Sequence, residues 1–114
     1  MSRFVVLGHD WPEPHLDLLI EFDGVLKAWR LPADFDPTLP CPATANADHR
    51  LRYLDSEGPV SGDRGTVTRW DGGDAEWIEL GDERFVVRFG GITLRGRYEL
   101  VHRDDSMWEF RPLK

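Results

Sequence analysis

Short runs of alternating apolar and polar residues, each ended by Gly, Asp or Pro, dominate the hydrophobic pattern of this chain. Such runs predict β-strands, because successive side chains of a strand point to opposite faces and turn residues close each run. No segment keeps a helical period over three turns, which favours an all-β fold. The expected strands are Arg3–Leu7, His15–Phe22, Val25–Leu31, Gly65–Trp70, Ala75–Leu80, Arg84–Phe89, Ile92–His102 and Met107–Leu113.

Turn residues between these runs predict antiparallel neighbours. Asp23-Gly24 is a strong hairpin signal, since both residues tolerate the positive φ of a type I′ turn. The segment from Pro32 to Pro42 holds four prolines and predicts an extended surface loop. Many short antiparallel strands with regular turns indicate a barrel or a sandwich. Further reversals are expected at Asp71-Gly72-Gly73, Gly81-Asp82 and Gly90-Gly91.

Composition limits the class of protein. A chain of 114 residues fits one domain, residues 1–114, and its five Trp and six Phe supply bulky core material. The single cysteine, Cys41, cannot form an intramolecular disulfide and suits a reducing compartment. No apolar run approaches the roughly 20 residues of a membrane span, and the N-terminus lacks the pattern of a signal peptide. We therefore expect a cytoplasmic protein with no membrane partner, whose net charge of −7 opposes general nucleic-acid binding.

Residues 9–24, HDWPEPHLDLLIEFDG, contain a candidate metal site. From His15 onward the segment alternates, so the imidazole of His15 and the carboxylate of Asp17 project to the same side of one strand. A turn restricted by two prolines can fold His9 back beside His15. This mixed nitrogen and oxygen set suits manganese, zinc or iron and does not choose among them. The same spacing also fits exposed polar residues on a half-solvated sheet face, with His9 as an ordinary turn residue.

An ordered set of motifs extends over nearly the whole chain. It consists of Phe4-Val5-Val6, His9, His15-Leu16-Asp17-Leu18 with Glu21, Asp23-Gly24-Val25-Leu26-Lys27-Ala28-Trp29, Asp48-His49-Arg50-Leu51-Arg52-Tyr53 with Glu57-Gly58, Gly65-Thr66-Val67 with Trp70-Asp71 and Gly73, Leu94-Arg95-Gly96-Arg97-Tyr98 with Leu100-Val101, and Trp108. In this order the motifs resemble the 3′-phosphoesterase domain of bacterial ligase D, the multifunctional enzyme of non-homologous end joining. The chain looks like a shortened, stand-alone and divergent member of that family.

The resemblance implies a compact β-barrel of about eight mainly antiparallel strands and a manganese-dependent enzyme, with zinc as the alternative metal. Such an enzyme trims DNA 3′ ends in repair, removing a terminal ribonucleoside and then the 3′-phosphate. Carried over residue by residue, His9, His15 and Asp17 are the metal ligands. His49 and Tyr53 contact the scissile phosphate, with His49 as the acid–base residue. The expected substrate is a nucleic-acid 3′ end or a smaller phosphate ester.

Three features depart from the family pattern. Leu19 stands where the family has an arginine that clamps phosphate, and Ala33 stands where it has a lysine. The family's basic N-terminal arm is also missing, because the first strand starts at Arg3. Losing two cations near the phosphate removes several kcal/mol of transition-state stabilisation. The arginines that could take over are Arg30, Arg50, Arg52 and Arg64, and the sequence does not choose among them.

Two other functions compete with the enzyme. The first is a binding module that keeps the fold, binds metal or phosphate, and docks on another repair protein or senses a ligand. Leu19 and Ala33 favour it, whereas the joint presence of the five polar residues named above favours catalysis. The second is a cupin-like metal barrel, which the order of the ligase D motifs disfavours. Lys27, Cys41 and His102 receive no functional role.

Overall fold

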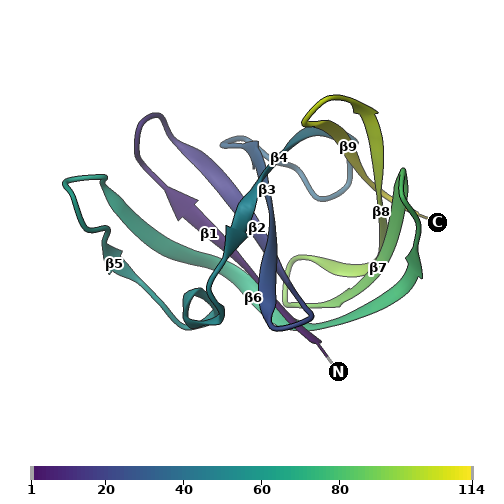
Figure 1. Cartoon of the computed structure of the whole chain (residues 1–114), viewed down its shortest axis with the longest axis horizontal. Helices are drawn as coiled ribbons and strands as arrows, with labels where there is room; N and C mark the ends of the chain where they lie inside the picture. The colour runs from purple at the N-terminus through teal and green to yellow at the C-terminus, as the bar shows by residue number, and fades with distance from the viewer. Residues whose placement is uncertain (1, 114) are drawn as a thin grey trace.

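The computed structural model describes residues 2–113, which form nine antiparallel strands and one turn of 3₁₀ helix (Figure 1). These residues contain no helix that could span a membrane. The elements are β1 (Ser2–His9), β2 (His15–Phe22), β3 (Val25–Pro32), β4 (Cys41–His49), η1 (Leu51–Leu54), β5 (Gly58–Pro59), β6 (Thr66–Leu80), β7 (Arg84–Gly90), β8 (Arg95–Asp104) and β9 (Met107–Pro112).

Eight of the strands close into a barrel. The strand order is β1-β2-β3-β4-β9-β8-β7-β6-β5, and β1 also pairs with β6, which joins the two ends of the eight-stranded part. The short strand β5 pairs only with β6 and lies outside the barrel, as does η1 (Figure 1). The predicted all-β barrel of about eight strands is confirmed.

Two separate hydrophobic clusters hold the molecule together. The larger cluster fills the barrel with inward-facing side chains, including the stacked rings of Tyr98 and Phe110. The smaller one, which we call the outer cluster, lies on the outer face of β1, β2 and β3 beneath η1 and the start of β6. It consists of Val5, Leu7, Leu19, Leu26, Ala28, Leu54 and Val67. The outward side of β2 is therefore not uniformly polar.

The predicted reversal at Asp71-Gly72-Gly73 is wrong. Strand β6 runs through these residues, pairing with β1 up to Ala75 and with β7 from Asp74 onward. A Cβ atom on Gly73 would clash with the carbonyl oxygen of Gly90. The glycine at this position therefore allows two strands to approach closely. In the sequence such a glycine cannot be told from one that marks a turn.

Asp71 joins β6 to the turn between β7 and β8. Its carboxylate accepts hydrogen bonds from the backbone amides of residues 92–94 at 2.7–3.0 Å. Burial alone would raise the pKa of this carboxyl, but backbone hydrogen bonds, the one from Leu94 foremost, hold the pKa below its ordinary value. Asp71 of the Trp70-Asp71 motif thus stabilises the barrel by fixing the turn between β7 and β8.

Other sequence expectations need smaller corrections. Strand β4 and the turn η1 were not predicted, and the Pro-rich loop is confined to residues 33–40. This loop closes over the barrel: Phe35 is buried in the interior cluster, and the Tyr98 hydroxyl donates to the carbonyl of Pro37 at 2.6 Å. Ile92, expected in a strand, lies in the turn after β7 and is 90% exposed. The reversals at Asp23-Gly24, Gly81-Asp82 and Gly90-Gly91 are confirmed.

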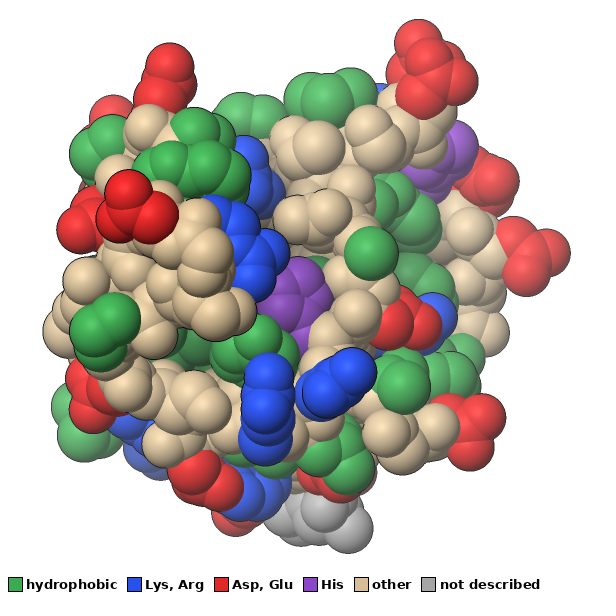
Figure 2. All heavy atoms as spheres, turned by 60° about the vertical axis from the view of Figure 1, so that its left-hand side comes forward, with side chains coloured by type: hydrophobic (Ala, Val, Ile, Leu, Met, Phe, Trp, Pro, Cys, Tyr) green, Lys and Arg blue, Asp and Glu red, His purple; other side chains and the backbone are tan. Residues whose placement is uncertain are grey.

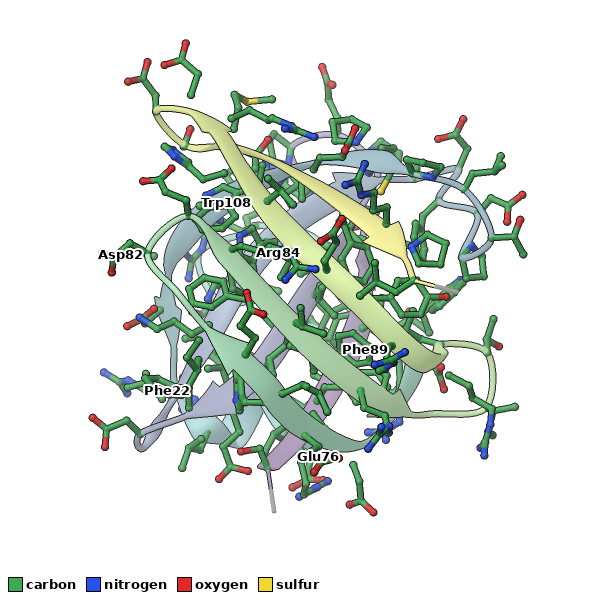
Figure 3. All side chains as sticks on the ribbon, turned by 90° about the vertical axis from the view of Figure 1, so that its right-hand side faces the viewer. Phe22, Glu76, Asp82, Arg84, Phe89 and Trp108 are labelled. Carbon is green, nitrogen blue, oxygen red and sulfur yellow. The ribbon has the colours of Figure 1, made fainter. Side chains whose placement is uncertain are left out.

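The outer face of β7, β8 and β9 carries a ladder of ion pairs (Figure 3). Glu99, only 3% exposed, accepts from the guanidinium groups of Arg84 and Arg111, and Arg84 also pairs with Glu79 at 2.8 Å. Burial works against the charge of Glu99, but the two arginines lower its pKa below the ordinary value. Arg84 and Arg111 on this face are therefore already paired.

We expect Asp71→Ala to lower the free energy of unfolding by at least about 2 kcal/mol, because several backbone amides lose a charged acceptor. Chemical denaturation measures this change. The exposed Asp74→Ala, three residues along the same strand, serves as the control and should stay within about 0.5 kcal/mol of the wild type. Equal effects of the two substitutions would contradict the structural role of Asp71.

Candidate metal centre

Strands β1 and β2 bring His9 and His15 face to face. Their Cα atoms are direct partners in the ladder, and the ring centroids are 5.0 Å apart. Asp17, two residues after His15, points to the same side because side chains alternate along a strand. The expectation that the turn at residues 10–14 folds His9 back beside His15 matches this geometry.

Two backbone carbonyls orient the imidazole rings. The Nε2 atom of His9 lies 2.8 Å from the carbonyl oxygen of Arg64, and the Nδ1 atom of His15 lies 2.8 Å from that of Glu13. A carbonyl oxygen only accepts hydrogen bonds, so each of these nitrogens carries the ring proton in the neutral imidazole. The lone pairs then reside on Nδ1 of His9 and Nε2 of His15.

These two nitrogens converge on the carboxylate of Asp17. The distance from its oxygens is 3.7 Å to Nδ1 of His9 and 3.3 Å to Nε2 of His15. One ligand atom from each of the three residues lies within 4.8 Å of the others. Hydrogen bonds from ligand histidines to backbone carbonyls are typical of metal sites, since they fix the tautomer and orient the ring. The set can hold a divalent metal ion.

The loop before β6 builds this arrangement. Directly after β1, the Asp10 carboxylate accepts from the amide of Thr66 at 2.7 Å. The Asp10 amide donates to the Thr66 carbonyl at 3.4 Å, and together these bonds tie the loop to the β1–β2 turn. Gly65 has a φ of +78°, and a Cβ atom there would clash with the Asp10 carboxylate. Glycine at position 65 therefore lets the loop approach closely enough to present the Arg64 carbonyl to His9.

The three side chains are shielded but accessible, at 14%, 7% and 13% exposed for His9, His15 and Asp17. The two histidines and Ala33 border an open depression of about 330 Å³. Figure 2, which faces the side of the molecule that carries β5, shows a histidine side chain in a hollow bordered by Lys and Arg side chains. Three candidate ligands in an open site would leave coordination positions of a metal ion free for water or substrate.

His49 and Tyr53 form a second group. They come from the end of β4 and from η1, and their ring centroids are 5.5 Å apart. The Nδ1 atom of His49 lies 2.9 Å from the carbonyl of Ala47, which leaves Nε2 for other contacts. Arg50 and Arg52 line the same open pocket, of about 340 Å³, and the guanidinium of Arg52 lies over the Tyr53 ring.

The two groups share the outer face of β1–β4 but are offset along it. On β3, Arg30 is the partner of Asp17, whereas Leu26 is the partner of His49. Four residues of strand correspond to about 13 Å. Leu19 lies between the groups, fully buried in the outer cluster. The five residues singled out in the sequence therefore reach one face as two neighbouring groups.

Sequence reasoning missed the carbonyls of Glu13 and Arg64, because backbone groups leave no side-chain signal. Gly65 was the only residue of this loop whose type signalled a close approach of the backbone. The sequence also could not separate Arg30 from the other arginines. In the structure, the Arg64 guanidinium donates to Ser61, while Arg30 stands directly opposite Asp17.

The three residues without an assigned role have contacts of their own. His102 bridges two turns, with Nδ1 2.6 Å from Glu83 and Nε2 2.7 Å from the carbonyl of Asp105. Lys27 pairs with Asp48 at 3.6 Å. Burial, reinforced by Asp34 and Glu109, raises the pKa of the Cys41 thiol to about 11, so this cysteine stays protonated.

Comparison with known proteins decides the family. A family model described as the DNA Ligase D 3′-phosphoesterase domain matches residues 8–102. The chain belongs to this family. The match includes every residue of the two groups described above.

This 3′-phosphoesterase family member has relatives in several bacteria. It is 31% identical over 99% of its length to the multifunctional non-homologous end joining DNA repair protein LigD of Mycobacterium tuberculosis. It is 34% identical over 95% of its length to the LigD protein of Pseudomonas aeruginosa. The chain spans only 16% and 14%, respectively, of those two proteins.

We expect Gly65→Ala to weaken binding of a divalent metal ion at these three residues by about 10- to 100-fold, because displacing the Arg64 carbonyl frees the His9 ring. Gly62→Ala is the matched control: its φ of +74° imposes similar strain, but its Cβ would meet only the end of the Arg64 side chain at 3.5 Å. Calorimetric titration with Mn²⁺ compares the two variants. Equal losses of affinity would show that strain alone, not the carbonyl, is responsible.

We expect the pKa of His102 to lie above 6.5, because the Asp105 carbonyl and the Glu83 carboxylate both accept from its protonated ring. Its contribution to stability is then complete below 6.5 and is lost as the pH rises through the folded-state pKa. An NMR titration of the ring protons measures the value. Glu83→Gln should lower it, and a pKa that does not respond would contradict the bridge.

Proposed function

We propose that this chain is a metal-dependent phosphoesterase that acts on 3′ ends of nucleic acid during DNA repair by non-homologous end joining. One observation carries the proposal: two histidines held as defined tautomers point their lone pairs at one carboxylate, in a chain that belongs to the ligase D 3′-phosphoesterase family. The names of the relatives place those proteins in non-homologous end joining, which supports the same process for this chain.

In this proposal His9, His15 and Asp17 hold a divalent metal, with manganese as the first candidate and zinc as the second. The donor set fits, since two imidazole nitrogens and a carboxylate suit either ion. When bound, the metal neutralises phosphate charge and lowers the pKa of a coordinated water. The carbonyls of Glu13 and Arg64 keep the two rings in the tautomers that such binding requires.

The His49 group supplies proton transfer and anion binding. With Nδ1 directed at Ala47, the free Nε2 of His49 is the atom that gives or takes a proton at the leaving oxygen. The Tyr53 hydroxyl can donate to a phosphoryl oxygen as charge develops on it. Arg50 and Arg52 beside them attract the anion, so a locally positive pocket serves a chain whose net charge is −7.

A second candidate is a metal- or phosphate-binding module without turnover, which docks on a repair protein or senses a ligand. Leu19 favours it, because this side chain is buried among apolar residues and offers no contact to an anion. Ala33 favours it as well, since this small exposed residue brings no charge to the depression beside the histidines. We place either function in the cytoplasm and treat residues 1–114 as one domain.

We expect the manganese-loaded protein to release inorganic phosphate from a 3′-phosphorylated primer–template, and His15→Ala to abolish this release. His49→Ala should bind manganese like the wild type and lower kcat by about 10²- to 10⁴-fold, since it removes the proton-transfer group. Phosphate release and metal content are measured on the same samples.

His102→Ala is the control, because this histidine lies in turns away from both groups, and its rate should equal that of the wild type. If the wild type releases no phosphate at high concentration while manganese is shown to be bound, the enzyme is excluded and the binding module remains. If the wild type binds no metal, the enzyme as proposed fails and only a phosphate-binding module remains.

A further inference from the structure

We infer that Arg30 is the residue that grips the substrate phosphate beside the metal centre, and that it selects terminal phosphate monoesters over diesters. The identity of the substrate in this inference rests on the proposed function, whereas the position of Arg30 beside the candidate metal ligands does not depend on catalysis. It assigns the anion contact to strand β3, whose only cation in the family motifs of this chain, Lys27, already pairs with Asp48.

The position of Arg30 is set by strand pairing. Its Cα is the partner of Asp17 on β2 and of Thr44 on β4. Cross-strand partners project to the same face, so the guanidinium leaves the barrel on the side of the candidate metal ligands. Leu19, the next outward residue of β2 after Asp17, is buried in the outer cluster and leaves this role vacant.

The hydrogen-bonding capacity of Arg30 is unmet. Its Nε atom is buried and has no hydrogen-bond partner in residues 2–113. No carboxylate in that part of the chain pairs with it, although Asp17 stands on the neighbouring strand. Buried donors are almost always satisfied, and those of a cation are the most costly to leave free. A bound anion supplies the missing acceptor.

The other arginines near this face are already engaged. Arg3 pairs with Asp55 at 3.0 Å, and Arg69 donates to the carbonyl of Leu54 at 3.0 Å. Arg64 donates to Ser61 through its own loop. Since Arg50 and Arg52 line the pocket of His49, Arg30 is the cation best placed to contact an anion held at His9, His15 and Asp17.

The chemistry of the guanidinium indicates the class of substrate. Its planar fork matches two oxygens of a phosphate at once. A terminal monoester has three non-bridging oxygens, enough for this fork and for one further contact at the metal centre. A diester has only two, so it cannot satisfy both contacts independently. Arg30 therefore favours a terminal phosphate over an internal or ribonucleotide diester linkage.

The test uses inorganic phosphate as the ligand of the full chain, with and without bound manganese. Arg30→Met should weaken phosphate binding by at least about tenfold, measured by calorimetry, and leave manganese affinity within about twofold of the wild type. Arg30→Lys, which keeps the charge without the fork, should recover only part of the affinity. Arg97→Gln, an exposed arginine on β8, is the control and should bind phosphate like the wild type.

Loss of fold is not expected to confuse this test, since Arg30→Met removes a buried unpaired donor and keeps the apolar stem. In the activity assay, Arg30→Met should reduce kcat/KM for a 3′-phosphate more than for a 3′-ribonucleotide diester. If the wild type binds phosphate through Arg30 but shows no turnover, the inference stands and the proposed enzyme fails. Unchanged phosphate affinity in Arg30→Met, or loss of manganese together with phosphate, would overturn the inference.

Discussion

The pairing of His9 with His15 across the β1–β2 ladder is the constraint on which the candidate site depends. Side chains alternate in a strand, so a slip of one residue would turn His15 and Asp17 into the barrel and bring Leu16 and Leu18 out. The apolar residues on the inner face of β2 prevent this slip, because their burial in the barrel is worth several kcal/mol in total. The hydrophobic core thus fixes the ligand geometry, and the loop ending at Gly65 adds only the carbonyl that orients one ring.

The barrel interior and the outer cluster stabilise different parts of the molecule. The interior cluster holds the eight strands together and contains none of the candidate site residues. The outer cluster supports η1 and the start of β6, and so connects the His9 group to the His49 group over an apolar floor. Leu19 belongs to that floor. A leucine there strengthens the packing beneath η1 but leaves a gap in the positive lining of the site, which is why the unpaired guanidinium on β3 matters.

The sequence predicted features that depend on local chemistry and failed where tertiary contacts decide. Asp23-Gly24 and the alternation from His15 to Phe22 define a hairpin by themselves, and both were predicted with the right bounds. The segment of β4 is rich in Ala, Thr and Asn, so its strand exists through pairing with β3 and β9 rather than through apolar alternation. Asp71 and its glycines look like a turn because the same residue types also cap loops and permit close strand contacts. The proximity of His9, His15 and Asp17 was predictable from spacing, whereas the orientation of Arg30 required the register of three strands.

Closure of β1 onto β6 has a further consequence for behaviour at high concentration. A sheet that returns on itself exposes few free backbone amides, so a second chain finds little edge on which to add a strand. The remaining edge strand, β5, has only two residues, and one of them, Pro59, has no amide hydrogen to donate. Nearby, the backbone amide of Arg69 on the same edge of β6 donates a hydrogen bond to the Glu57 carboxylate. Residues 57–65, which present the Arg64 carbonyl to His9, therefore also protect the edge of β6 against pairing with another chain.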